Sequence, residues 1–285
     1  MNLLIFGLGY TGKALARRLM AKGWSVTATV RRPEHRAQAE ARGIEAVDPA
    51  NAVALAEAAG RARAILVTAP PGERGCPGLE ALAPAIGTAG AFPDWIGYLS
   101  TTGVYGDRGG GWVFETSALN AHSVEGARRV AAERDWRQVG RGMGLTITSF
   151  RLPGIYGPGR SSFERLRDGT ARRLIKPGHV FSRIHVDDLA AGLEASIARP
   201  RAGAVYNLCD DEPASAAEVT AYAAGLLGMT PPPEELFDPA ALSPAAQRFY
   251  EECKRVSNAR AKAELDWRPA YPTYREGLAA ILSHH

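Results

Sequence analysis

The sequence predicts an α/β fold: a doubly wound parallel sheet with a smaller C-terminal α/β subdomain for the substrate. Three observations predict it. A glycine-rich turn follows an apolar run at the N-terminus, short apolar runs then alternate with helical segments, and after residue 154 the segments shorten and Gly, Pro and Arg become frequent. Strands that alternate with helices favour a parallel sheet with right-handed crossovers, whose ligands bind at the carboxyl ends of the strands.

The glycine-rich turn predicts a dinucleotide site of the Rossmann type. The apolar run 2–6 suits a buried strand, and it leads into Gly7-Leu8-Gly9-Tyr10-Thr11-Gly12 and then a helix. Gly7 permits the tight turn, Gly9 lets a pyrophosphate approach the backbone because it has no Cβ, and Gly12 lets helix and strand pack closely. The helix N-terminus presents free N–H groups to the phosphates. A strand, this turn, a helix and a second strand within about thirty residues are the context that the motif requires.

The remaining elements follow from apolar periodicity. We expect strands over 2–6, 25–30, 44–47, 64–69, 95–100, 145–151 and 204–208. We expect helices over 13–22, 51–59, 79–89, 126–139, 186–198 and 215–227, the last with a capping box of Ser215 and Glu218. The proline run 231–233 is expected to be a linker. The dinucleotide-binding domain is predicted to comprise 1–154 with 179–200, and the substrate subdomain 155–178 and 201–285.

The end of the second strand indicates which cofactor binds. An NAD site usually has an acidic residue there to hold the ribose 2′-hydroxyl, whereas this chain has Arg31 and Arg32, with Glu34 only after Pro33. Arginine suits a 2′-phosphate because it makes charge-assisted hydrogen bonds. We therefore expect NADP(H) over NAD(H), with NAD still possible. The alternative is that one or both arginines are solvated loop charges.

Composition excludes several other classes of protein. The net charge of +4 is spread over 285 residues without a run of five or six like charges, which argues against a nucleic-acid partner. Three distant cysteines, Cys76, Cys209 and Cys253, fit a reducing cytoplasm, and the histidines show no metal-ligand spacing. No apolar run suits a signal peptide or a membrane span. We expect a cytoplasmic monomer or homodimer whose partner is a small molecule.

Several segments, in this order, resemble the extended short-chain dehydrogenase/reductases, the NAD(P)-dependent epimerase/dehydratase superfamily. They are FGLGYTG (6–12), YLSTTGVYGD (98–107), RLPGIYGPG (151–159), RIHVDDLAAG (183–192), AVYNLCDDEPAS (204–215) and SNARAKAELDWRP (257–269). The resemblance covers nearly the whole chain and implies a nicotinamide cofactor. It places Asp48 at the adenine, Pro153 beside the nicotinamide, and Tyr10, Thr11 and Ala69 among the cofactor-binding residues.

The chain departs from this family at its catalytic motif. In the family a tyrosine and a lysine four residues apart transfer the proton; here the aligned positions hold Glu125 and Arg129, while the active-site Ser/Thr is kept as Thr101. A glutamate with an ordinary pKa is a poor proton donor at neutral pH, and arginine does not share protons as lysine can. The chain therefore resembles the superfamily's atypical branch, which lacks the Tyr/Lys pair. His122, just before the helix, is a candidate proton carrier, or else a solvated loop histidine.

Basic residues gather in the later part of the chain, where the family holds its anionic substrate. They are Arg160, Arg165, Arg167, Arg172, Arg173, Lys176, Arg183, Lys254 and Arg255.

The sequence as a whole is compatible with two functions. The first is an NADP(H)-dependent oxidoreductase or epimerase acting on a sugar-like, anionic or nucleotide-linked small molecule. The second is a non-catalytic NADP(H)-binding sensor or regulatory protein on the same fold. The sequence leaves open whether the protein is an enzyme, because Glu125 and Arg129 favour the second and Thr101 the first.

Overall fold

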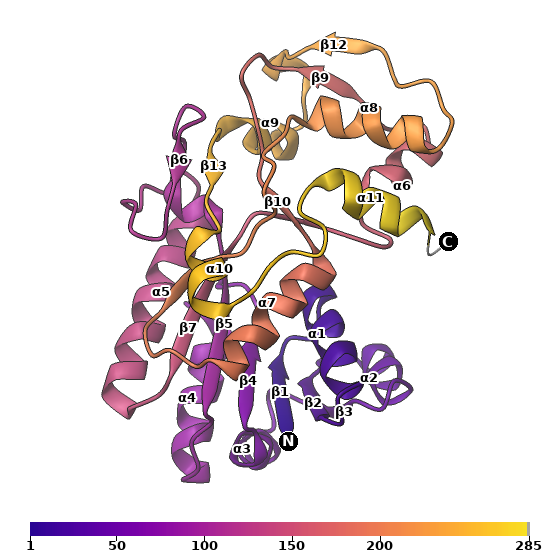
Figure 1. Cartoon of the computed structure of the whole chain (residues 1–285). Helices are drawn as coiled ribbons and strands as arrows, with labels where there is room; N and C mark the ends of the chain where they lie inside the picture. The colour runs from indigo at the N-terminus through magenta and orange to yellow at the C-terminus, as the bar shows by residue number, and fades with distance from the viewer. Residues whose placement is uncertain (284–285) are drawn as a thin grey trace.

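In the computed structural model, which describes residues 1–283, a seven-stranded parallel sheet lies in the lower part of the view in Figure 1. Its strands are β1 (Asn2–Phe6), β2 (Ser25–Thr29), β3 (Glu45–Val47), β4 (Ala64–Val67), β5 (Trp95–Thr101), β7 (Ile147–Leu152) and β11 (Val205–Asn207). Each hydrogen-bonded pair within this sheet is parallel. The expected fold class, a Rossmann-type doubly wound sheet, is confirmed.

The strand order determines where a ligand can bind. The order is β11-β7-β5-β4-β1-β2-β3, so the chain builds outward from β1 to β3 and then returns to place β4 on the other side of β1. Helical connections therefore leave β1 and β4 toward opposite faces of the sheet. This arrangement opens a crevice at the carboxyl ends of the strands, where open α/β sheets bind ligands.

The core consists of two apolar layers, one on each face of the sheet. Leu3 and Ile5 of β1 belong to one layer, and Leu4 and Phe6 belong to the other, because successive side chains of a strand point to opposite faces. The first layer is completed by α1 (Tyr10–Met20), α2 (Pro33–Glu40), α7 (Val186–Ala198) and α10 (Ala259–Leu265). The second is completed by α3 (Ala52–Arg61), α4 (Pro77–Ala89) and α5 (Val124–Met143).

Smaller elements cover the carboxyl edge of the sheet (Figure 1). Three parallel strand pairs lie there: β8 (Gly154–Tyr156) with β10 (Arg183–His185), β9 (Arg173–Ile175) with β12 (Glu234–Leu236), and β6 (Trp112–Val113) with β13 (Arg255–Val256). The helical segments are η1 (Thr102–Tyr105), α6 (Ser162–Arg167), α8 (Ala216–Leu226), η2 (Pro239–Ala241), α9 (Pro244–Glu251) and α11 (Tyr274–Ser283). A third apolar cluster packs α6, α8 and α11 together. The expected domain boundaries stay a prediction.

The observed elements differ from the expected ones mainly at their ends. Helix α1 begins at Tyr10, three residues early, because Gly9 already serves as its N-cap. Helix α2 was not expected at all; its only buried residue is Ala39, so it shows no apolar periodicity, and Pro33 at its first turn is its main sequence signal. The capping box of α8 is confirmed: Ser215 Oγ accepts from Glu218 N at 3.1 Å, and Glu218 Oε2 accepts from Ser215 N at 2.9 Å.

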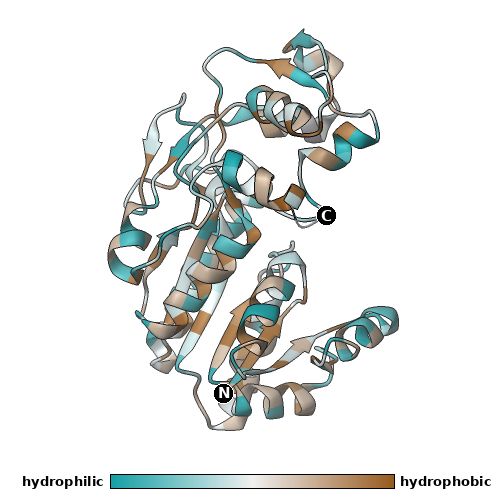
Figure 2. Cartoon of the chain, turned by 45° about the vertical axis from the view of Figure 1, so that its right-hand side comes forward, coloured by the Kyte–Doolittle hydropathy of each residue, from teal (hydrophilic) through white to brown (hydrophobic). Residues whose placement is uncertain are grey.

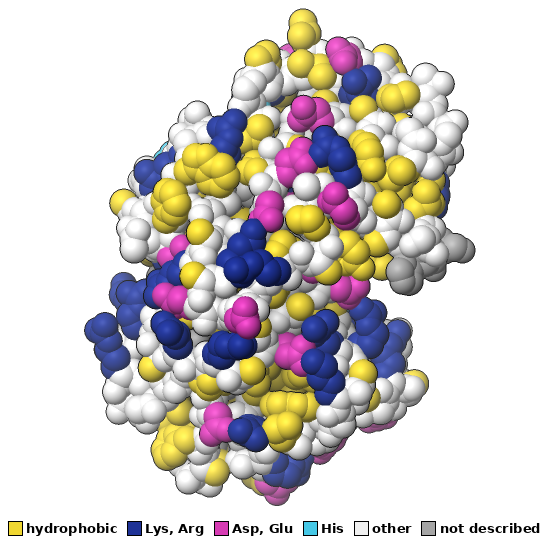
Figure 3. Space-filling view, in the orientation of Figure 1, with side chains coloured by type: hydrophobic (Ala, Val, Ile, Leu, Met, Phe, Trp, Pro, Cys, Tyr) yellow, Lys and Arg dark blue, Asp and Glu magenta, His cyan; other side chains and the backbone are white. Residues whose placement is uncertain are grey.

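Polarity over the molecule follows these layers. The strands of the central sheet are largely hydrophobic and the outer helix faces largely hydrophilic (Figure 2). On the face shown in Figure 3, Lys and Arg side chains are interspersed with Asp and Glu. Within the described part of the chain, no helix combines the length and the apolar character that crossing a membrane would require.

Candidate cofactor and substrate sites

A cavity of about 1330 Å³ lies at the crevice between β1 and β4. Its wall includes residues that lie one or two positions after four strands: Gly7 after β1, Arg31 after β2, Pro49 after β3 and Ala69 after β4. The volume is ample for an extended ligand. This is the place where the strand order predicts a dinucleotide, and of the expected cofactor residues Gly7, Arg31, Arg32 and Ala69 line it.

The glycine loop has the geometry that the motif requires. Gly7 has a φ of +95°, and a Cβ there would lie 2.8 Å from Thr68 Oγ1. At Gly12 a Cβ would lie 3.1 Å from Ile5 Cγ2 and 3.3 Å from the carbonyl oxygen of Gly7, so this glycine lets helix and strand pack closely. A Cβ at Gly9 would meet nothing within 4 Å. Space is therefore open in front of Gly9, and the loop's glycines fit the approach of a phosphate to the backbone.

Basic side chains form part of the wall of this cavity. Arg31 and Arg32 line it together with Lys13, His35 and Arg42. Arg32 is already engaged, since its Nε lies 3.4 Å from Glu34 Oε1 and its Nη2 lies 2.8 Å from His35 Nε2. Arg31 is exposed and makes no hydrogen bond or ion pair with the residues that the structure describes. The sequence did not point to Lys13, although it lies on the expected helix α1. It did not point to His35 or Arg42 either, which lie within and just after α2, a helix that was not foreseen.

The other six expected cofactor residues lie outside this cavity wall: Gly9 and Gly12 of the glycine loop, Pro153, which lines the second cavity described below, and Asp48, Thr11 and Tyr10. Asp48 is exposed, and its Oδ1 accepts from Ala50 N at 2.9 Å, which forms the turn after β3. Thr11 is buried within α1. Tyr10 donates its hydroxyl to the carbonyl oxygen of Pro158 at 3.0 Å, and burial, followed by the charge of Asp187, raises its pKa to about 12. The phenol of Tyr10 thus links the glycine loop to residues 157–160 instead of lining the cavity.

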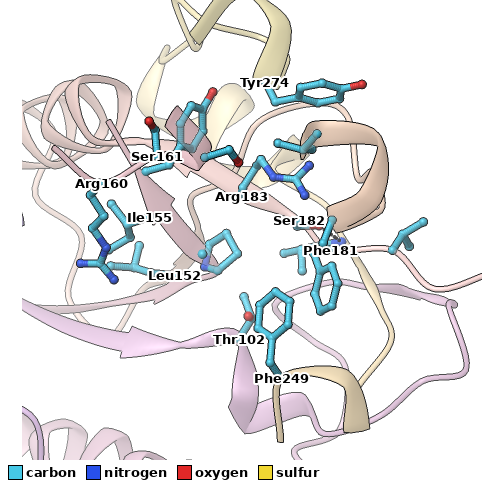
Figure 4. Close-up of a pocket in the computed structure, with 18 of the residues that line it drawn as sticks. Thr102, Leu152, Ile155, Arg160, Ser161, Phe181, Ser182, Arg183, Phe249 and Tyr274 are labelled. Carbon is cyan, nitrogen blue, oxygen red and sulfur yellow. Dashed lines mark hydrogen bonds between the residues drawn. The ribbon is translucent and has the colours of Figure 1, made fainter. Parts of the chain in front are cut away.

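A second cavity, of about 680 Å³, lies beyond the ends of β5 and β7 (Figure 4). Thr101, the last residue of β5, and Pro153, which follows β7, are both on its wall. Thr102 and Phe249 lie together at one end in Figure 4, and Arg183 and Tyr274 lie together at the other. The cavity is bounded on the outer side by α8, α9 and α11, so it has the position expected of a substrate site.

The retained Thr101 is held in a fixed orientation. Its Oγ1 accepts a hydrogen bond from Gly103 N at 3.1 Å, at the start of η1. An accepting hydroxyl keeps its own proton free to donate. Thr101 can therefore donate a hydrogen bond into the cavity that it lines.

Glu125 and Arg129 do not form the i, i+4 ion pair that their spacing allows. Glu125 is exposed at the first turn of α5. Arg129 donates from Nη1 to the carbonyl oxygen of Leu99 in β5, and its guanidinium lies 6.0 Å from the ring centre of Tyr98. Neither side chain lines either of the two cavities. Arg129 donates to the carbonyl oxygen of Leu99 in preference to Glu125, because a buried carbonyl needs a donor, whereas an exposed carboxylate is hydrated.

His122 lies in the loop before α5. It is exposed, and its Nε2 lies 3.1 Å from Nδ2 of Asn120. It lines neither cavity. The structure therefore brings Thr101 and Pro153 to the substrate cavity, and leaves His122, Glu125 and Arg129 outside its wall.

A buried polar network fixes the strand ends beneath this cavity. Arg151 and Glu133 are 3% and 2% exposed and form an ion pair, with Nη2 to Oε2 at 2.8 Å. Ser100 Oγ donates to Glu133 Oε1 at 2.5 Å, Arg151 Nη1 donates to Tyr105 Oη at 3.0 Å, and Tyr105 donates to Asn207 Oδ1 at 2.7 Å. Ser100 and Arg151 directly precede Thr101 and Leu152. The network thereby holds the cavity edges of β5 and β7 in place.

The cations that reach the cavity are a subset of the basic cluster. Arg160, Arg165, Arg183 and Lys254 line it. Lys254 is 8% exposed and pairs with Glu252, which also lines the cavity. Arg172 and Arg173 instead pair with Glu235 and Glu234 at 2.5 Å and 2.8 Å. The remaining members, Arg167, Lys176 and Arg255, are not on the wall.

Of the aromatic residues of the wall, only Tyr156 lies in a segment that the sequence singled out, RLPGIYGPG. Phe181 and Phe249 stack with ring centres 4.0 Å apart and an interplanar angle of 18°. Tyr156 and Tyr274 also line the cavity. No spacing signal connects these residues, since they come from four different segments. Over residues 1–283 the structure contains no cluster of three His, Cys, Asp or Glu side chains that could hold a metal ion.

Comparison with known proteins relates this architecture to a family. The model of the NAD dependent epimerase/dehydratase family matches residues 3–209. Protein YeeZ of Escherichia coli K12 is 31% identical over 249 residues, which cover 80% of this chain and 84% of YeeZ.

Solved structures show the same fold. A functionally unknown conserved protein from Silicibacter pomeroyi superposes with a TM-score of 0.91 at 46% identity, covering 99% of this chain and 98% of the other. UDP-glucuronic acid 4-epimerase from Bacillus cereus, in complex with UDP-glucuronic acid and NAD, superposes with a TM-score of 0.80 at 17% identity, covering 100% and 98%. At that identity the epimerase shows likeness of fold alone.

Proposed function

Because the chain belongs to the NAD dependent epimerase/dehydratase family, we propose that it is an NADP(H)-dependent oxidoreductase or epimerase. Its substrate would be a sugar-like, anionic or nucleotide-linked small molecule. The observation that carries the proposal is the pairing of two cavities at one edge of the sheet. The first has the open glycine loop and Arg31, and the second has Thr101 and four cations on its wall. We also propose a cytoplasmic monomer or homodimer.

The residues of the first cavity suit a nicotinamide dinucleotide phosphate. Gly7 and Gly9 leave room for the pyrophosphate at the N-terminus of α1. Arg31, which is exposed and unengaged, would hold the 2′-phosphate, with Arg32 and His35 beside it. A bound cofactor of this kind would supply or accept a hydride. NAD(H) lacks the 2′-phosphate and would leave Arg31 without a partner.

The residues of the second cavity would bind and orient the substrate. Thr101 would donate its hydroxyl proton to a substrate oxygen, and the cations of the wall would attract the anionic group. Glu252 and Lys254 are paired ionisable groups that line the cavity. They therefore lie closer to a bound substrate than Glu125, which lies outside its wall.

A second candidate function is a non-catalytic NADP(H)-binding sensor or regulatory protein. The observation that favours it is the position of Glu125 and Arg129: one is exposed, and the other is bound to the carbonyl oxygen of Leu99. Neither offers a proton to the substrate cavity. On this alternative the cavity would bind a ligand without turnover.

One experiment separates the two functions. The protein would be incubated with NADPH or NADP⁺ and a panel of nucleotide sugars, sugar acids and other small acids. The absorbance of NADPH would report net oxidation or reduction, and analysis of the recovered ligand would report epimerisation, which leaves the amount of NADPH unchanged. Turnover that Thr101→Val reduces, with NADPH affinity unchanged, supports the oxidoreductase. A ligand that binds with NADP⁺ present but is recovered unaltered supports the sensor.

A further inference from the structure

Arg183 places an unpartnered buried nitrogen at the wall of the substrate cavity. It begins β10, and its Nη2 donates to the carbonyl oxygen of Ala214 at 3.0 Å. Its Nη1 is buried and has no hydrogen-bond partner among the described residues. The guanidinium lies 5.5 Å from the ring centre of Tyr274, and Figure 4 shows the two side chains together at one end of the cavity. A buried donor without a partner is costly, so this position is incomplete in the protein alone.

The nearest buried acid leaves the charge of Arg183 unneutralised. Asp210 N donates to the carbonyl oxygen of Arg183 at 2.7 Å, so the two backbones are in contact. Yet the Asp210 carboxyl is 2% exposed, both its oxygens lack hydrogen-bond partners in the described chain, and it forms no ion pair with Arg183 within 4.0 Å. Burial raises the pKa of Asp210 to about 8, although Arg183 opposes this shift. At neutral pH Asp210 is therefore largely uncharged.

The other acids near Arg183 are engaged elsewhere. Asp211 lies 2.5 Å from Lys262 Nζ, and Glu212 pairs with Arg275. Glu218 caps α8 through Ser215. The two carboxylates of the cavity wall are also engaged: Glu164 in the capping box of α6 and Glu252 with Lys254. Tyr156 and Tyr274 carry no charge near neutral pH, because the ordinary pKa of a phenol is about 10 and burial raises the pKa of both further.

We propose that Arg183 binds an oxyanion group, carboxylate or phosphate, on a ligand whose apolar or planar part packs beside Phe181 and Phe249. This inference deepens the proposed function and rests on it for the identity of the cavity as the substrate site. Nη1 of Arg183 would make a charge-assisted hydrogen bond to the anion, and the anion would neutralise the guanidinium. Phe181 is two residues before Arg183, so both belong to the same stretch of wall. The proton on Asp210 keeps this charge available, because ionised Asp210 would compete with the ligand for Arg183.

The first test measures binding without any nicotinamide cofactor or turnover. Benzoate, phenyl phosphate and uncharged benzamide are titrated into the protein by calorimetry. The proposal expects benzoate or phenyl phosphate to bind at least tenfold more tightly than benzamide, and the tighter of the two identifies the anion. Arg183→Met should lower the affinity for the anion at least tenfold. Arg167 is exposed and lies outside the wall, so the control Arg167→Met should change this affinity less than twofold. Binding that survives Arg183→Met in a folded variant, or is absent from the unaltered protein, would overturn the proposal.

The second test uses Asp210 and does not depend on the folding of Arg183→Met. Benzoate keeps its charge between pH 7 and pH 9, whereas Asp210 ionises. If only the form with neutral Asp210 binds the anion, the affinity should fall about tenfold over this range. Asp210→Asn, which cannot ionise, should hold the affinity constant. An equal fall in both proteins, or no fall in the unaltered one, would show that Arg183 and Asp210 do not form the anion site.

If the anion site is present while no substrate is turned over and NADPH fails to bind, the proposed function fails and the inference about Arg183 stands. If instead an uncharged substrate is turned over and Arg183→Met has no effect, the proposed function stands and the inference about Arg183 fails.

Discussion

Arg129 binds the carbonyl oxygen of Leu99 at the carboxyl end of β5, and Glu125, one turn earlier on α5, extends into solvent. These two residues align with the family's proton-transfer pair, and their spacing places them on one side of the helix. They nevertheless do not bind each other, because Arg129 binds the sheet and Glu125 faces water. Arg129 ties α5 to the strand that carries Thr101. Its role in this geometry is to position the strand end.

The position of Glu125 predicts a small effect of mutation. Glu125→Gln should change any turnover less than about twofold, because removal of a true general acid usually costs about 10² to 10⁴ in rate. The same assay on Glu125→Tyr with Arg129→Lys should show gained reduction of simple ketones if the missing pair is what limits activity. Robust turnover by the unaltered protein that Glu125→Gln abolishes would make Glu125 a catalytic residue and contradict this account.

Gly9→Val should abolish dinucleotide binding and leave the fold intact. A Cβ at Gly9 meets nothing within 4 Å and its φ is −87°, so the folded protein accommodates the new side chain. The side chain would occupy the space that the pyrophosphate needs. Fluorescence titration with NADPH gives the affinity, and circular dichroism verifies the fold. Unchanged affinity in the folded variant would place the cofactor elsewhere.

The buried pair of Glu133 and Arg151 predicts a large loss of stability. Glu133→Gln leaves the charge of Arg151 buried without a counter-ion and should lower the free energy of unfolding by about 3 kcal/mol. Replacing both residues, Glu133→Leu with Arg151→Met, should recover part of the loss, because an apolar pair has no uncompensated charge. Urea unfolding measures both. A single variant as stable as the unaltered protein would show that the network does not support the strand ends.

Asp210 should make the protein less stable as the pH rises from about 4 to about 8. Its pKa is raised from 3.8 to about 8 by burial, so in this range the folded protein retains a proton that the unfolded chain has lost. Stability therefore falls until the folded group also ionises. Asp210→Asn removes this dependence and should raise the free energy of unfolding at pH 8.5 by more than about 1.4 kcal/mol, the equivalent of one pKa unit. Parallel pH profiles of the two proteins would contradict the assignment.

The sequence predicted those features of the protein that are determined by residues close together in the chain. The turn of Gly7, the capping box of Ser215 and Glu218, and the strand–helix alternation each follow from residues within one turn or one unit of the fold. They define the sheet and the dinucleotide cavity. Helix α2 escaped prediction because it packs only one residue, Ala39, into the core.

The substrate cavity could not be predicted in the same way. Phe181 and Phe249 stack across 68 positions of sequence, and Arg183 lies beside Tyr274, which is 91 positions away. Such contacts depend on how α9 and α11 fold over the edge of the sheet, and no local pattern specifies them. For the same reason the sequence did not predict the hydrogen bond of Tyr10, whose partner Pro158 is distant in the sequence.

The central claim is that the crevice between β1 and β4 binds NADP(H), and a competitive titration of NADPH and NADH against the protein tests it most directly. Arg31 lines the cavity and is free to hold a 2′-phosphate, so NADPH should bind at least tenfold more tightly, the effect of one charge-assisted hydrogen bond of about 1.4 kcal/mol or more. Arg31→Asp should reverse the preference, because an acid accepts the free ribose hydroxyl and repels the phosphate. Equal or tighter binding of NADH by the unaltered protein would contradict the account.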